Sequence, residues 1–147
     1  MLIIIVTNTE IQYFCKKEKL MIELGIKGHQ ETIVTMANVA STVGSGRVSV
    51  FATPMMIALM EKAAAISIEP YLSEGQSSVG TSICVTHISA TPVGMKVWAD
   101  TEVIGIDRRK ITFSVKAYDE SGLIGEGTHD RFIIDVDKFK EKAYKKL

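Results

Sequence analysis

The chain has 147 residues, enough for one domain to bury roughly two thirds of the surface that an unfolded chain exposes. Its 17 basic and 17 acidic residues cancel, so no overall field attracts nucleic acid or an anionic membrane. The two cysteines, Cys15 and Cys84, form neither a metal-ligand pattern nor a disulfide framework, which is typical of the reducing cytoplasm. The sequence therefore predicts neither a metal nor a cofactor.

The first 20 residues differ from the rest of the chain. They begin with the apolar run LIIIV, which has no basic residues before it and is far shorter than the ~20 residues of a membrane span. Because the charged run KKEKL precedes Met21, we expect residues 1–20 to be either an extension upstream of the native start or a short edge strand. Residues 21–139 then form a single domain, and residues 140–147 form a basic tail.

A strand, a loop and a helix follow in chain order. The segment ETIVTMANV, residues 31–39, mixes β-branched and polar residues and predicts a strand. STVGSGRVS, residues 41–49, has two glycines and four hydroxyl residues and predicts a loop. From Pro54 to about Ile68 the chain is largely apolar, which indicates a buried helix. It ends before Pro70, because a residue preceding proline is disfavoured in the helical conformation.

The second half of the chain predicts strands only. The strands cover residues 77–90, 95–106, 111–118 and 123–136, and a short basic helix or tail follows them. Because no helices alternate with these strands, we expect an α+β fold with a mainly antiparallel sheet. One long central helix on a curved antiparallel sheet of five to six strands is the hotdog arrangement, although other α+β rolls share the pattern.

Glu61 is a charged residue on an apolar face of the predicted helix. Its neighbours three and four positions away are Ile57, Ala58, Ala64 and Ala65. A carboxylate in such surroundings must be paired, hydrogen-bonded, protonated or beside a cavity. The pattern fits a general base or a nucleophile, unless the helix rotates enough to expose the side chain to solvent.

A histidine is a possible partner for this carboxylate. The period of two places His87 on one strand face with Val79, among apolar residues. We expect His87 to be either a core residue or, if it meets Glu61, the imidazole of an acid/base pair. His129 on the last strand is a weaker candidate, and His29 lies in a segment without a clear pattern.

Thr53 lies where the helix begins and has two interpretations. Followed by Pro54, it resembles an ordinary helix N-cap worth ~1 kcal/mol. Alternatively, its hydroxyl and the free N–H groups of the first turn hold a carbonyl oxygen or an oxyanion. Thr53 and Glu61 are ~12 Å apart along a continuous helix, so they contact different parts of one substrate unless the helix starts later.

Several basic residues have two interpretations as well. They are either solvated surface charges or bind the phosphates of a nucleotide-bearing carrier. These residues are Arg108, Arg109, Arg131 and the tail lysines.

Three segments together resemble one family. VFATPMMIALMEKAA, VGTSICVTHISATPVG and IGEGTHDRFIIDVDKF are similar to the fluoroacetyl-CoA thioesterase family, a branch of the hotdog-fold acyl-CoA thioesterases, and the resemblance covers about residues 31–139. It implies a homodimer with acyl-CoA at the subunit interface, and hydrolysis of the thioester by Thr53 of FAT, Glu61 of LME and His87 of VTH. It also implies that Gly80 and Arg131 lie beside the substrate.

The chain departs from this family in one loop. Members selective for fluoroacetyl-CoA have phenylalanines in a lid just before FAT, whereas STVGSGRVSV, residues 41–50, has no aromatic residue. This departure argues against fluorine selectivity and favours a general short-chain or small-acyl thioesterase. The alternative function is non-catalytic acyl-CoA binding or regulation, although such a protein has no reason to bury a glutamate and a histidine together. A hydratase of this fold would place its acidic residue and histidine differently.

Overall fold

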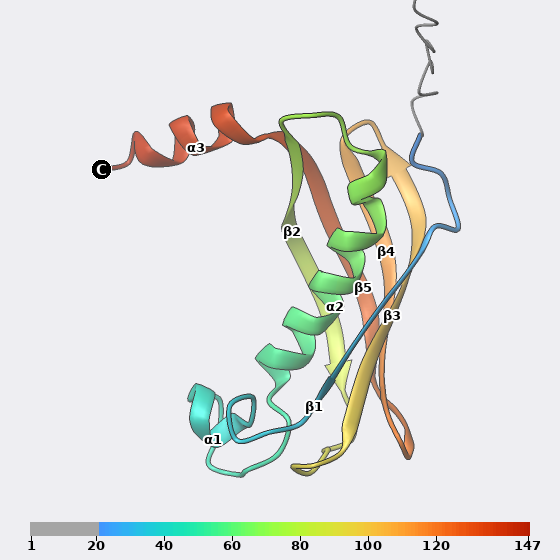
Figure 1. Ribbon diagram of the computed structural model, residues 1–147, viewed down its shortest axis with the longest axis vertical. Helices are drawn as coiled ribbons and strands as arrows, with labels where there is room; N and C mark the ends of the chain where they lie inside the picture. The colour runs from blue at the N-terminus through green and yellow to red at the C-terminus, as the bar shows by residue number, and fades with distance from the viewer. Residues whose placement is uncertain (1–20) are drawn as a thin grey trace, which may run out of the picture.

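The computed structural model describes residues 21–147, and the expectations for residues 1–20 lie outside this range. Five strands form one antiparallel sheet in the order β1-β3-β4-β5-β2, and the long helix α2 packs on one of its faces (Figure 1). The predicted α+β class is thus confirmed. The strands are β1 (Lys27–Ile33), β2 (Gln76–His87), β3 (Lys96–Asp107), β4 (Lys110–Asp119) and β5 (Gly122–Asp135).

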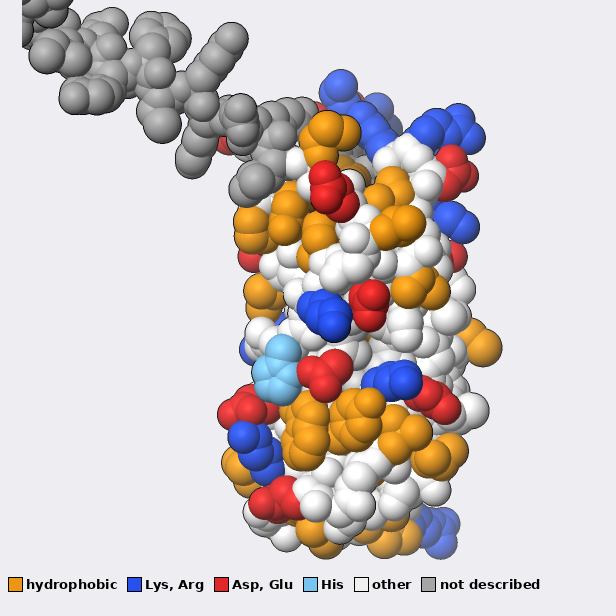
Figure 2. Space-filling view, turned by 90° about the vertical axis from the view of Figure 1, so that its right-hand side faces the viewer, with side chains coloured by type: hydrophobic (Ala, Val, Ile, Leu, Met, Phe, Trp, Pro, Cys, Tyr) orange, Lys and Arg blue, Asp and Glu red, His pale blue; other side chains and the backbone are white. Residues whose placement is uncertain are grey.

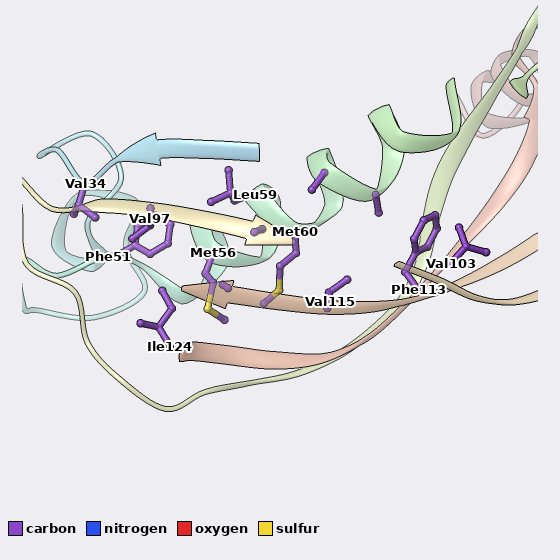
Figure 3. Packing of buried hydrophobic residues seen from close by; sticks show 14 of the residues in the cluster. Val34, Phe51, Met56, Leu59, Met60, Val97, Val103, Phe113, Val115 and Ile124 are labelled. Atoms are coloured by element: carbon purple, nitrogen blue, oxygen red, sulfur yellow. The ribbon is translucent and has the colours of Figure 1, made fainter. Parts of the chain in front are cut away.

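Helix α2 (Thr53–Ile68) forms the core together with the sheet. Pro54 suits its first turn because the fixed φ of proline is helical and its missing N–H is not needed there. The 3-10 turn η1 (Glu69–Tyr71), which contains Pro70, follows the helix. Side chains of α2 pack against inward-facing residues of β3, β4 and β5 (Figure 3). The buried residues of α2 are Met56, Leu59, Met60, Ala63, Ala64 and Ile68.

The first strand was predicted too late in the chain. A strand over residues 31–39 is wrong in its second half, because the chain turns after Ile33. The Asn38 side chain closes that turn, accepting the Thr35 N–H at 2.8 Å and donating to the Ile33 carbonyl at 3.1 Å. The loop expected next contains one short helix, α1 (Ala40–Val43).

A β-bulge in β2 changes which residues face the helix. The pairing of β2 with β5 shifts between Gly80 and Ser82, so the strand gains one residue relative to its partner. As a result Gly80, which pairs with Arg131, shares a face with His87. Val79 lies on the opposite face, so its predicted place beside His87 is wrong.

The last helix, α3 (Val136–Tyr144), crosses the domain boundary expected at residue 139. The Asp135 side chain caps it by accepting the N–H of Lys138 at 3.1 Å. None of its residues is buried, and it extends past the β2 edge of the sheet, away from the other strands (Figure 1).

Charge is spread over the outside of the molecule. Figure 2 shows a face on which basic and acidic side chains alternate with apolar ones. Ion pairs join neighbouring strands, among them Lys116–Glu126 at 3.9 Å and Lys110–Asp130 at 3.6 Å. In the part of the chain that the structure describes, no helix combines the length and apolarity needed to cross a membrane.

Candidate active site

Thr53 and His87 meet at the start of α2. The Thr53 hydroxyl lies 2.8 Å from His87 Nδ1, and the helix N-cap is Ala52, so Thr53 is not the cap that sequence reasoning considered. His87 Nε2 is buried and has no hydrogen-bond partner in residues 21–147. The pair lines an open hollow of about 270 Å³, together with Phe51 and residues 88–90. An imidazole nitrogen without a partner is available to exchange a proton with a substrate or a water.

Glu61 lies two turns further along α2, at a second hollow of about 420 Å³. Its side chain is 42% exposed, and Gly80, Ser78 and Arg131 line the same hollow. Gly80 lies so close that a Cβ on this residue would collide with Glu61 Oε1. The absence of a side chain at Gly80 therefore makes room for the carboxylate.

Arg131 is held beside this carboxylate by three hydrogen bonds. Its Nε donates to Ser78 Oγ at 2.9 Å and its Nη2 to the Ser78 carbonyl at 2.8 Å, while Nη1 donates to His129 Nε2 at 3.2 Å. His129 Nε2 lies 3.9 Å from Glu61 Oε1. The hollow thus presents a carboxylate and a guanidinium, with the buried His129 imidazole behind them, a set suited to binding and polarising a carbonyl compound.

Burial keeps both imidazoles of these clusters uncharged. Loss of hydration lowers the pKa of His87, although the backbone of Ser89 opposes the shift. Burial also lowers the pKa of His129, and the nearby Arg131 charge adds to this effect. Both rings are therefore neutral at neutral pH and able to accept protons. Burial likewise lowers the pKa of Arg131, whereas the negative charge of Glu61 raises it.

The structure does not bring Glu61 and His87 together within one chain. Glu61 contacts the group around Arg131 and His129, whereas His87 contacts Thr53 in the other hollow. No hydrogen bond or ion pair joins Glu61 to His87 within residues 21–147. Within one chain, the condition for an acid/base pair, that His87 meets Glu61, is therefore not met.

Sequence reasoning underrated His129 and missed Ser78. A signal for His129 was present, because His129 and Arg131 are two residues apart on a strand and must share a face. Ser78 had no such signal, because its contact with Arg131 depends on the bulge. Within the described residues, no group of three or more His, Cys, Asp or Glu side chains is arranged to hold a metal ion.

The chain matches the family model of fluoroacetyl-CoA-specific thioesterases over residues 34–137. A curated relative, a fluoroacetyl-CoA thioesterase of Streptantibioticus cattleyicolor, is 43% identical over 97 residues, which are 66% of this chain and 70% of the relative. Residues 34–137, which match the family model, include all five residues of the two hollows that the sequence indicated: Thr53, Glu61, Gly80, His87 and Arg131.

Solved structures show the same fold. The fluoroacetyl-CoA thioesterase FlK is 33% identical and superposes with a TM-score of 0.81, covering 86% of this chain and 98% of the other. A FlK mutant in complex with fluoroacetate and CoA is 34% identical, with a TM-score of 0.77 and coverage of 80% and 99%. A thioesterase-superfamily member from Thermus thermophilus is 28% identical, with a TM-score of 0.78 and coverage of 84% and 92%. The predicted hotdog arrangement is confirmed.

Proposed function

Because the chain belongs to the family of fluoroacetyl-CoA-specific thioesterases, and so to the thioester hydrolases, we propose that it cleaves short acyl-CoA thioesters with Thr53, Glu61 and His87. The observation that carries the proposal is the half-exposed Glu61 carboxylate beside Arg131 and Gly80, in a hollow with room for a substrate. We further place this activity in the cytoplasm, on the strength of the cysteine pattern.

The geometry suits two routes of hydrolysis. In one, Glu61 attacks the thioester carbon and the resulting anhydride is hydrolysed by water; in the other, Glu61 removes a proton from the attacking water. In both routes the C–S bond breaks and CoA leaves as a thiolate. The neutral His87 imidazole accepts the proton that the water gives up during hydrolysis and passes it to this thiolate. Thr53 orients His87 through their 2.8 Å hydrogen bond, and Arg131 and Gly80 contact the substrate beside the thioester.

A homodimer accounts for the separation of the two hollows. Strand β2 is an edge strand of twelve residues with neither charged residues nor proline, whereas the other edge strand, β1, carries Lys27 and Glu31. Unprotected edges of this kind pair readily with another strand. A two-fold axis makes the pairing of two β2 strands antiparallel, and we propose this pairing as the dimer interface.

Such pairing shortens the path between the catalytic groups. Within one chain, Gly80 and His87 are seven residues apart on β2, or about 23 Å at ~3.3 Å per residue. If the axis passes through the middle of β2, the partner subunit's His87 lies opposite Gln76, only four residues or about 13 Å from Gly80. Glu61 of one subunit and the Thr53–His87 pair of the other then serve one acyl-CoA.

We propose that the enzyme accepts small acyl groups without selecting for fluorine. The segment over residues 41–50 supplies no aromatic side chain, and among its residues Val43 and Val48 are apolar and exposed. Such a segment lacks the rigid apolar cover that would separate fluoroacetyl from acetyl groups. Acetyl-, propionyl- and fluoroacetyl-CoA should therefore show kcat/KM values within about tenfold of one another, a difference of ~1.4 kcal/mol.

Release of free thiol from these acyl-CoA substrates tests the function. We expect Glu61→Gln and His87→Ala to lower kcat/KM by at least about a hundredfold, because each removes a group that moves protons or attacks the thioester. Glu69→Gln, which changes an exposed carboxylate at the end of the same helix, is the matched control and should retain activity. If the parent chain binds CoA but releases no thiol, the non-catalytic binding function is correct instead.

A further inference from the structure

His129 is a buried histidine that the proposed mechanism does not use. Its side chain is 1% exposed and stacks against Phe113 of β4, with the ring centroids 6.3 Å apart. Nδ1 lies 2.8 Å from the carbonyl oxygen of Ser82 on β2, and Nε2 lies 3.2 Å from Nη1 of Arg131. Both ring nitrogens thus have partners, which is typical of a side chain with a fixed orientation.

The chemistry of these partners determines the state of the ring. A carbonyl oxygen only accepts hydrogen bonds, so Nδ1 must carry a proton and donate it to Ser82. A guanidinium only donates, so Nε2 must carry a lone pair and accept from Arg131. Both contacts are satisfied only by the neutral ring with its proton on Nδ1. A protonated His129 would lose the second contact and place a cation against Arg131.

His129 and Ser78 together determine where Arg131 points. Three of the five guanidinium N–H groups donate to Ser78 Oγ, the Ser78 carbonyl and His129 Nε2, which leaves two for a ligand in the hollow beside Glu61. We propose that His129 is a positioning residue of the thioesterase site, an uncharged acceptor that holds Arg131 in place and releases it when protonated. The inference rests on the proposed function for its effect on catalysis.

The charges around His129 come from two elements. Glu61 on α2 and Asp130 on β5 raise the pKa of His129, whereas Arg131 on β5 lowers it. Strands β2 and β4 contribute uncharged groups, the carbonyl of Ser82 and the ring of Phe113. Burial has the largest effect and lowers the pKa, so the neutral ring is maintained at neutral pH and is lost only in acid.

Two substitutions separate the hydrogen bond from the titration. His129→Gln keeps an acceptor for Arg131 and does not titrate, whereas His129→Leu removes the acceptor at every pH. At pH 8 we expect kcat/KM to fall about tenfold in His129→Leu, since one charge-assisted hydrogen bond to Arg131 is lost, and far less in His129→Gln. In acid, the parent should lose kcat/KM faster than His129→Gln. The measured quantity is the ratio of kcat/KM in the parent to kcat/KM in His129→Gln at each pH. Groups that titrate in both proteins, such as His87, cancel from this ratio.

A parent and a His129→Gln variant with parallel pH profiles would overturn the proposal, as would full activity in a folded His129→Leu variant. If His129→Leu does not fold, the comparison of pH profiles between the parent and His129→Gln still tests the proposal.

Nitrogen NMR of the substrate-free parent gives a test that needs no turnover. We expect the His129 ring to carry its proton on Nδ1 at neutral pH, and a proton on Nε2 instead would overturn the inference. Failure of the proposed function has a different signature, namely no thiol release by the parent, with the ring state as expected.

Discussion

His87 on β2 and His129 on β5 are imidazoles on neighbouring strands, on the sheet face that packs against α2. Burial lowers the pKa of each, with Arg131 contributing at His129. Thr53 contacts one nitrogen of His87, and Ser82 and Arg131 contact the two nitrogens of His129, so the structure orients both rings as well as keeping them neutral. At this scale the site depends on two uncharged histidines, of which His129 lies beside the charged side chains of Glu61 and Arg131.

The lowered pKa values predict a loss of stability in acid. When the chain unfolds, both rings return to the ordinary pKa of about 6.5, so below that pH the unfolded state binds more protons than the folded state. Their contribution is fully present above about pH 6.5 and is lost as pH falls towards the lowered pKa values. Urea unfolding should therefore give a smaller free energy at pH 5 than at pH 7.5, and His129→Gln should reduce this difference.

His29 provides the matched control for that measurement. Its ring is 54% exposed, and the hydrogen bond to Asp100 raises its pKa, so its small contribution is present in acid and lost as pH rises. His29→Gln should not reduce the acid loss. If His129→Gln loses as much stability in acid as the parent, the buried ring does not have the state inferred for it.

At two positions, glycine is needed because two elements pack closely and leave no room for a side chain, and not because the backbone has a positive φ. Gly28 of β1 lies against α2, and a Cβ there would be 2.6 Å from Thr101 Oγ1 and 2.9 Å from Ser67 Cβ, as well as against the Ala63 carbonyl. The backbone of β1 therefore packs directly on the helix, and this contact helps to fix the position of α2. The same principle applies at Gly80, where the absent side chain makes room for Glu61.

Gly28→Ala should lower the free energy of unfolding by roughly 1–3 kcal/mol, because the added methyl forces β1 and α2 apart in a packed region. Urea denaturation at pH 7.5 measures the change. Gly46→Ala is the control, since its Cβ would make only ordinary contact with Ala40 Cβ at 3.5 Å. Equal stability of the two variants would mean that β1 adjusts without cost and does not fix the helix.

For the whole molecule, the main consequence of the structure is that one chain holds its proposed catalytic groups in two hollows. Antiparallel pairing of β2 strands would unite Glu61 of one subunit with His87 of the other. Two inactive variants should then complement each other. Mixing Glu61→Gln with His87→Ala after denaturation and joint refolding should restore about a quarter of the parental activity, because half of the dimers are mixed and each has one intact site.

Each variant refolded alone is the control for this experiment and should stay inactive. A site complete within one chain predicts no recovery on mixing, because every chain then lacks one catalytic group. That result would contradict the shared site while leaving the thioesterase assignment intact.

Helix α3 offers a second test of the dimer. It has no buried residue, and Phe139 and Tyr144 are 44% and 67% exposed although a short isolated helix is marginal in water. Because α3 extends past the β2 edge, we expect it to contact the partner (Figure 1). Phe139→Ser should raise the dimer dissociation constant roughly tenfold in sedimentation experiments. Glu141→Ser, two residues away and therefore on the opposite side of the helix, should not.

The sequence by itself determined the fold class and most of its elements. The apolar run between Pro54 and Pro70 predicted α2, and the alternation from Ile111 to Tyr118 predicted β4, because both signals are local and repeat with the period of the structure. Glu61 was also conspicuous, since a carboxylate among apolar neighbours is unusual at any position on such a helix. The catalytic roles of Thr53, Glu61 and His87 stay predictions.

Only the tertiary structure decided how these side chains are grouped. The bulge after Gly80 moved Val79 to the other face and brought Ser78 to Arg131, and a local period cannot reveal an extra residue in a pairing with β5, about 50 positions away. The first strand ends earlier than predicted because the Asn38 side chain donates to the Ile33 carbonyl and closes a turn, and a hydrogen bond of this kind leaves no periodic signal in the sequence. Glu61 lies with His129 and not with His87 because strand register, which is set by contacts distant in sequence, fixes which side chains meet across the sheet.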